Sequence, residues 1–188
     1  MDFFNAIKIE DKIFEQYIGK YEINSIIDYL AANINANYMH SSSIEEPLII
    51  IGILNGSFMF LSDLVKKLNI PCEIHFIKVS SYIRTKSSGN VTSILGLTRD
   101  ITNHNVLIVE DIIDTGTTMV KLLQDLSLQN PKNIEICTFL YKKSKCVNEL
   151  DIKYIGKEIE DKFVIGYGLD YNNIGRNHDT VYALISDT

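Results

Sequence analysis

Three carboxylates and a hydroxyl-rich turn lie close together in the middle of the chain. The acids are Glu110, Asp111 and Asp114, and the turn that follows them is Thr115, Gly116, Thr117 and Thr118. Carboxylates accept hydrogen bonds from sugar hydroxyls, hold divalent cations and exchange protons, whereas hydroxyls and free backbone N–H groups bind phosphate. These residue types together predict a site for a phosphorylated ribose and a magnesium ion.

Two elements have to position this turn. The run 106–109 is continuously aliphatic, which is typical of a parallel strand covered on both faces. Apolar residues then recur with helical spacing at Met119, Leu122, Leu123 and Leu126, so a helix is predicted to begin near Gly116. Its first turn offers unbonded N–H groups and the positive end of the helix dipole. An isolated Asp-Thr-Gly motif is most often a helix cap. The run 106–118 contains more acids and hydroxyls than a helix cap requires.

The remaining sequence alternates between strand and helix patterns. We expect helices over 23–34 and 58–68, the second stopped by Pro71, and strands over 48–54, 72–79, 106–109, 134–141, 163–168 and 180–186. This alternation predicts an α/β fold with a mainly parallel central sheet flanked by helices, whose ligands bind at the carboxyl ends of the strands. We expect a single domain, with a core over about 45–155 and a small hood from about 1–20 and 156–188.

Composition excludes several classes of protein. The chain has 188 residues, of which 46% are hydrophobic, and its formal net charge is −6 with a pI near 5.2. An acidic balance argues against nucleic acid as a partner, and neither a signal peptide nor a membrane-spanning run is recognisable. Cys72, Cys137 and Cys146 show no metal-type spacing. We therefore expect reduced thiols and a cytoplasmic location.

The run 106–118 closely resembles the phosphoribosyl diphosphate (PRPP) motif of the type I phosphoribosyltransferases, in particular the hypoxanthine-guanine phosphoribosyltransferases. The resemblance covers roughly residues 45–186. It implies a magnesium-dependent transferase of purine salvage that converts hypoxanthine or guanine and PRPP into IMP or GMP and diphosphate. Because relatives form dimers or tetramers, it also implies a homodimer or homotetramer.

The same resemblance assigns roles around the PRPP motif. Glu110 and Asp111 would bind the ribose hydroxyls, directly or through Mg²⁺, and the turn 114–118 would wrap the 5′-phosphate. Asp114 would also transfer a proton at purine N7. Asp170, in a Tyr-Gly-Leu-Asp-Tyr motif, would hold magnesium against the diphosphate, and Arg176 would bind that diphosphate.

A second group of residues is expected to read the purine. By resemblance, Lys142 donates to the purine oxo group, Phe163 stacks on the ring and the backbone of Val164 reads the ring edge. Taken alone, Lys142 would more often be a solvated surface charge and Phe163 a core residue. An ammonium group has only donors and so disfavours the amino group of adenine. Lys143 is adjacent, and a shift of one residue would exchange the two lysines.

Two loops complete the expected site. Asn55 and Gly56 correspond to the family's diphosphate loop, which relatives form with a non-proline cis peptide, although Asn55 replaces their usual Lys or Arg. The polar segment 80–90 resembles the flexible loop that closes over the reacting centre and begins with a Ser-Tyr pair, here Ser81 and Tyr82. We expect a mobile lid over about 81–97 that excludes water.

Two alternatives stay open at this point. A regulatory protein with the phosphoribosyltransferase fold could bind PRPP or a nucleotide without catalysis, although one that binds RNA would be expected to show a basic surface. A P-loop kinase is a weaker alternative, because the chain contains no G-x-x-x-x-G-K-[ST] motif.

Overall fold

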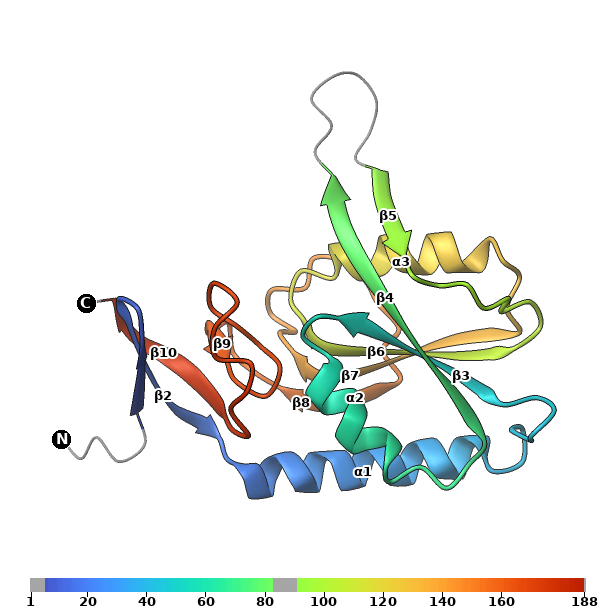
Figure 1. Cartoon of the computed structure of the whole chain (residues 1–188), viewed down its shortest axis with the longest axis horizontal. Helices are drawn as coiled ribbons and strands as arrows, with labels where there is room; N and C mark the ends of the chain where they lie inside the picture. The colour runs from blue at the N-terminus through green and yellow to red at the C-terminus, as the bar shows by residue number, and fades with distance from the viewer. Residues whose placement is uncertain (1–5, 83–90, 188) are drawn as a thin grey trace.

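The computed structural model describes residues 6–82 and 91–187, with side chains at 6–78 and 96–185. The elements run in the order β1 (Ala6–Ile9), β2 (Lys12–Ile18), α1 (Lys20–Tyr38), β3 (Leu48–Leu54), α2 (Phe58–Val65), β4 (Cys72–Tyr82), β5 (Val91–Leu95), β6 (Asn105–Ile113), α3 (Thr117–Ser127), β7 (Asn133–Tyr141), β8 (Tyr154–Glu158), β9 (Val164–Ile165) and β10 (Val181–Asp187) (Figure 1).

The main sheet has the strand order β5-β4-β3-β6-β7-β8 among the described residues. Its strands β4, β3, β6, β7 and β8 pair in parallel, and β5 pairs antiparallel to β4. The predicted α/β fold with a mainly parallel sheet is confirmed. A parallel sheet brings all its carboxyl ends to one edge, and the loops that follow β3, β6 and β7 meet there.

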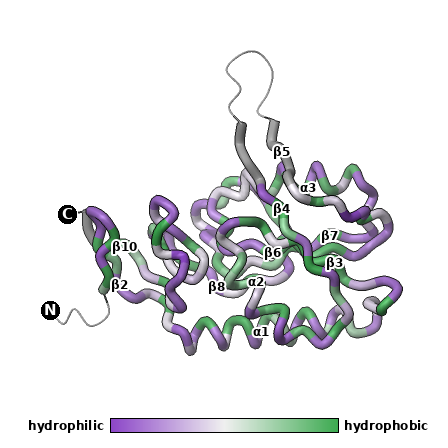
Figure 2. The backbone as a smooth tube through the Cα atoms, in the orientation of Figure 1, coloured by the Kyte–Doolittle hydropathy of each residue, from purple (hydrophilic) through white to green (hydrophobic). Residues whose placement is uncertain are grey.

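The two faces of the sheet pack against different helices. Along β3, Leu48 and Ile50 face a core built with α1 and α2, whereas Ile49 and Ile51 face a core built with α3 (Figure 1). Since successive side chains of a strand point to opposite faces, a strand covered on both sides has to be apolar throughout. Figure 2 shows this as a continuous hydrophobic β3, in contrast to the alternating pattern along α1.

A smaller antiparallel sheet is built from the two ends of the chain, in the order β1-β2-β10-β9. β10 pairs with β2 on one side and with β9 on the other. An aromatic cluster fills one side of this sheet, where the Phe14 and Phe163 rings lie 6.2 Å apart and the Phe163 and Tyr171 rings 5.9 Å apart. The small sheet thereby fixes the loop that carries Phe163.

Several expected boundaries were wrong. α1 spans Lys20–Tyr38 and not 23–34, and β4 extends to Tyr82 and does not end at 79. The helix that begins at Phe58 ends at Val65 because the next residues form tighter i→i+3 turns, for example from Leu68 N to Val65 O. The strand expected over 163–168 is reduced to Val164–Ile165, since Gly166, Tyr167 and Gly168 adopt positive φ. The strand expected over 106–109 extends to Ile113.

Two further observations concern the described residues. None of the described helices is long and apolar enough to cross a membrane. Cys72, Cys137 and Cys146 are free, as expected for reduced thiols.

Candidate active site

The acidic pair lies near the carboxyl end of β6, inside the strand. Glu110 pairs with Thr138 of β7, and the backbone N–H of Asp111 donates to Glu110 Oε1 at 3.3 Å. Desolvation, together with the neighbouring Asp111 carboxyl, raises the pKa of Glu110 well above its ordinary value. Two carboxyl groups held this close are stabilised by a cation or by hydroxyl donors, so the pair suits a metal-bound sugar.

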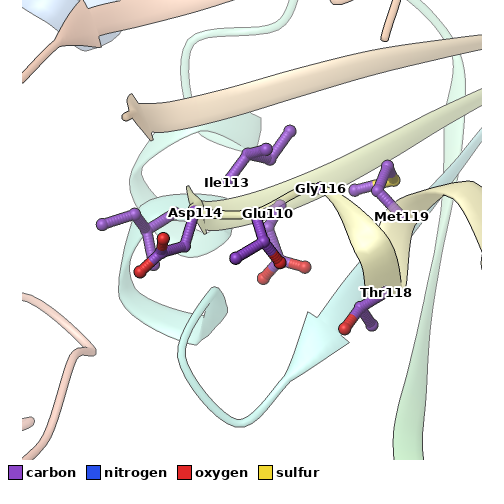
Figure 3. Close-up of a pocket in the computed structure, with 8 residues that line it drawn as sticks. Glu110, Ile113, Asp114, Gly116, Thr118 and Met119 are labelled. Carbon is purple, nitrogen blue, oxygen red and sulfur yellow. The ribbon is translucent and has the colours of Figure 1, made fainter. Parts of the chain in front are cut away.

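The turn after β6 forms a cavity of about 170 Å³. Gly116 has a φ of +77°, a left-handed conformation that favours glycine, and α3 begins directly after it. Figure 3 shows Glu110, Asp114 and Thr118 projecting from the same side of this connection. The lining residues are Glu110, Ile112, Ile113, Asp114, Thr115, Gly116, Thr118 and Met119. Five of the predicted PRPP residues, Glu110, Asp114, Thr115, Gly116 and Thr118, thus line one hollow at a helix N-terminus, where an anion is favoured, whereas Asp111 and Thr117 are not among its lining residues.

The segment after β7 holds this turn through hydrogen bonds to the Thr115 carbonyl oxygen. Asn148 Nδ2 donates to Thr115 O at 3.0 Å, and Val147 N donates to the same oxygen at 3.2 Å. A Cβ on Gly116 would lie 2.9 Å from Cys146 Sγ. Sequence reasoning missed Asn148, because its contact with the turn spans 33 residues and leaves no local pattern.

The loop 54–57 approaches the acidic pair directly. The Leu54–Asn55 peptide is cis, as the resemblance implied, and the Asn55 side chain is exposed. Gly56 packs so tightly that a Cβ on it would lie 1.7 Å from Asp111 Oδ2. On its other side, a Cβ on Gly168 would lie 2.0 Å from Gly56 O. The structure therefore brings Gly56, Asp111 and the loop around Gly168 into contact.

The predicted purine lysine lies at the start of the segment after β7. Lys142 is only 5% exposed, and its Nζ lies 3.2 Å from Asp114 Oδ2 and 3.0 Å from Asp161 Oδ1. Lys145 Nζ contacts the same two oxygens at 3.2 and 3.1 Å. Lys143 points elsewhere and pairs with Glu158. Lys142, rather than Lys143, therefore lies beside Asp114.

Asp161 and Lys145 were not among the predicted site residues. Both are common surface residue types, and only the folded arrangement places them against Asp114 and Lys142. The two lysines lower the pKa of Asp161, and the pKa of Lys145 is raised by Asp161 and then by Asp114. The second oxygen of Asp114, Oδ1, is buried and has no hydrogen-bond partner among the described residues.

Phe163 and Val164 lie at the start of β9. The Phe163 side chain is 45% exposed although it contacts Phe14 and Tyr171, whereas Val164 is buried. An aromatic ring that is held on one side and open on the other can stack on a planar base.

Asp170 and Arg176 are placed together. Arg176 Nη2 lies 2.6 Å from Asp170 Oδ1, Arg176 Nη1 donates to Gly168 O at 2.7 Å, and Asn173 N donates to Asp170 Oδ2 at 2.7 Å. The pair stiffens the Gly168 loop that packs on Gly56. Among the residues with described side chains, no three His, Cys, Asp or Glu residues form a metal-binding group.

The predicted lid lies partly outside the described residues. Ser81 and Tyr82 end β4, whose backbone pairs with β5. Their side chains and residues 83–90 lie outside the described part of the structure.

The sheet is open and mainly parallel, and its carboxyl edge carries the acidic pair Glu110 and Asp111 and the turn 114–118. This combination defines a class of α/β domains that bind phosphorylated sugars. The family model for the phosphoribosyl transferase domain matches residues 19–172, and the chain belongs to this family. It is 37% identical to the hypoxanthine-guanine phosphoribosyltransferase of Aquifex aeolicus, over 94% of this chain and 98% of the relative. It is 40% identical to the hypoxanthine phosphoribosyltransferase of Haemophilus influenzae, over 85% of this chain and 89% of the relative.

A solved structure shares the fold over most of the chain. The hypoxanthine phosphoribosyltransferase of Trypanosoma cruzi, in a ternary complex with substrates, superposes with a TM-score of 0.85 at 32% identity. The match covers 94% of this chain and 97% of that one.

Proposed function

We propose that this chain is a hypoxanthine-guanine phosphoribosyltransferase of purine salvage, which transfers the phosphoribosyl group of PRPP to a 6-oxopurine and releases diphosphate. The observation that carries the proposal is the buried Lys142 ammonium beside Asp114, at the edge of the phosphate turn. Relatives that cover nearly the whole chain carry the same activity in their names.

PRPP would occupy the hollow between β6 and α3. The hydroxyls and N–H groups of Thr115, Gly116, Thr117 and Thr118 would bind the 5′-phosphate, and Glu110 and Asp111 the ribose hydroxyls. The backbone around Asn55 and Gly56, with Arg176, would bind the diphosphate. Support for this placement comes from the close packing of Gly56 on Asp111, which leaves the loop backbone beside the sugar site.

The purine would lie between Phe163 and Lys142. Lys142 Nζ would donate to the oxo group, the Phe163 ring would stack on the base and the Val164 backbone would read its edge. Because an ammonium can only donate, the amino group of adenine is left unmatched in this site.

Asp114 would act as the proton acceptor. In the reaction, a bond forms between purine N9 and the anomeric carbon, the bond from that carbon to the diphosphate oxygen breaks, and the diphosphate leaves with the electron pair. The purine loses one proton from N7, and the Asp114 carboxylate accepts it. The position of Asp114 supports this role, since its side chain is 39% exposed and lines the hollow beside the Lys142 ammonium.

The acidic groups of the site fit a magnesium ion brought in with PRPP. Glu110 and Asp111 would hold it at the ribose and Asp170 at the diphosphate. Burial and the neighbouring Asp111 carboxyl raise the pKa of Glu110, so a cation beside this pair would stabilise its charged form. When bound, Mg²⁺ neutralises charge on the leaving diphosphate.

Two further proposals complete the description. Residues 81–97, with Ser81 and Tyr82 at their start, would close over the reacting centre and exclude water. The chain would act as a homodimer or homotetramer, which light scattering of the purified protein measures.

Product analysis tests the proposed function. Purified protein with PRPP, Mg²⁺ and hypoxanthine should give IMP and diphosphate in equal amounts, and chelation of Mg²⁺ should stop the reaction. The alternative, a regulatory protein of the same fold, predicts PRPP binding by calorimetry without IMP formation. That outcome would refute the proposal.

A further inference from the structure

Lys142, Lys145, Asp114 and Asp161 form a closed group in which each ammonium contacts both carboxylates. All four N···O distances lie between 3.0 and 3.2 Å. From this geometry we infer that Asp161 is a positioning residue for purine recognition, which holds the Lys142 ammonium toward the oxo group of the base. The inference rests on the proposed function, because it concerns how that site selects its purine.

The first argument is the number of donors on Lys142. An ammonium group has three N–H donors. Asp114 Oδ2 and Asp161 Oδ1 take two of them, so one donor is left for a ligand. Without Asp161, the ammonium keeps a single carboxylate partner and can turn about its flexible stem. The remaining donor is then no longer fixed in one direction.

The second argument is the balance of charge. Two ammonium groups and two carboxylates cancel, although Lys142 is buried. Loss of the Asp161 charge leaves two cations around the single Asp114 carboxylate. Both would compete for Asp114, the group that is proposed to accept the purine proton. A residue outside the PRPP motif thus keeps Lys142 and Asp114 available for two different atoms of the base.

The third argument is that Asp161 is held by a second lysine and lies near the surface. Lys145 is 40% exposed and bridges the same two oxygens, so it also holds the Asp161 carboxylate. Asp161 itself is half exposed, which means that its replacement does not open a cavity in the core. Replacement of Asp161 should therefore weaken purine binding and leave the fold intact.

Steady-state kinetics of Asp161→Asn test the inference, with KM measured separately for hypoxanthine and PRPP. Loss of one charged hydrogen bond to a partly solvated group is expected to raise the KM for hypoxanthine about 10-fold. The KM for PRPP should stay within about twofold, since the PRPP site gains and loses no contact. Asp161→Glu, which restores the charge, should recover most of the hypoxanthine affinity.

Glu160→Gln is the matched control. Glu160 is the neighbouring acid, its side chain is 78% exposed, and it pairs with Lys162 at 3.3 Å. This variant should keep both KM values of the parent. If Asp161→Asn behaves like Glu160→Gln, or if Asp161→Glu loses as much as Asp161→Asn, the positioning role is wrong. Absence of turnover by the parent chain with any 6-oxopurine would instead refute the proposed function itself.

Discussion

Gly56 offers a direct test of how the diphosphate loop is packed. In Gly56→Ala, the new methyl group would lie 1.7 Å from Asp111 Oδ2 and 2.4 Å from Asp111 Cγ. Contacts of a Cβ below 3.0 Å are essentially never found, so the carboxylate or the loop has to move. Asp111 is only 8% exposed and has little room to turn away.

The size of the effect follows from this displacement. The contact has to lengthen by about 1.3 Å to reach 3.0 Å, and a misplacement of about 1 Å in a site costs about 10²-fold in rate. We therefore expect kcat/KM for PRPP to fall about 100-fold, which corresponds to about 2.7 kcal/mol of transition-state stabilisation. Overpacking should also lower the unfolding free energy by about 1–3 kcal/mol, too little to unfold a protein of ordinary stability.

The assay is the initial rate of IMP formation over a range of PRPP concentrations at saturating hypoxanthine. Gly19→Ala is the matched control, because its Cβ would meet only the flexible end of Gln16, at 2.9 Å. This control should keep the parent's rate. A Gly56→Ala variant with kcat/KM within about threefold of the parent would show that the loop backbone does not lie against the PRPP site.

Three other substitutions separate the remaining roles. Asp114→Asn should lower kcat about 10²-fold with little change in PRPP affinity, and a kcat within about threefold of the parent would leave Asp114 a binding residue only. Asn55→Ala should leave the KM for PRPP nearly unchanged if the loop binds through its backbone, and a large increase would show that the exposed Asn55 side chain contacts the ligand. Desolvation raises the pKa of Glu135, but hydrogen bonds from Lys153 and Tyr38 outweigh it and bring the pKa below its ordinary value. A lowered carboxyl pKa stabilises the fold above the ordinary pKa, and this contribution disappears as the pH falls through the lowered value. Glu135→Gln should therefore reduce Tm at pH 7, with a smaller difference from the parent in acid and an unchanged kcat; an equal loss of Tm at all pH values would contradict the charge argument.

The sequence predicted the elements that are covered on both faces. β3 and β6 are aliphatic because helices pack on each side of them, and the stripe on α1 is regular because it faces a single core. β8 was missed, since it is a short strand at the edge of the sheet that ends in Gly156, Lys157 and Glu158. The glycine is required there by tertiary packing: a Cβ on Gly156 would lie 2.5 Å from Phe139 O.

Within the site too, local patterns could be predicted from the sequence and long-range contacts could not. The run 110–118 could be read from the sequence because its residues are contiguous and its chemistry is local. Lys142 and Asp161 are 19 residues apart and have no common pattern, and they meet because both follow elements that end at the carboxyl edge of the sheet. Long-range contacts of this kind depend on topology, which a local pattern does not contain.

The central claim is that a buried, donor-only lysine selects a 6-oxopurine for phosphoribosyl transfer. It is tested most directly by initial rates with PRPP, Mg²⁺ and equal concentrations of hypoxanthine, guanine, xanthine or adenine, followed by absorbance. Hypoxanthine and guanine should react, and adenine should be slower by about 10⁴-fold, because it leaves the buried donor unpaired. Turnover of adenine at a rate comparable to that of hypoxanthine would contradict the account.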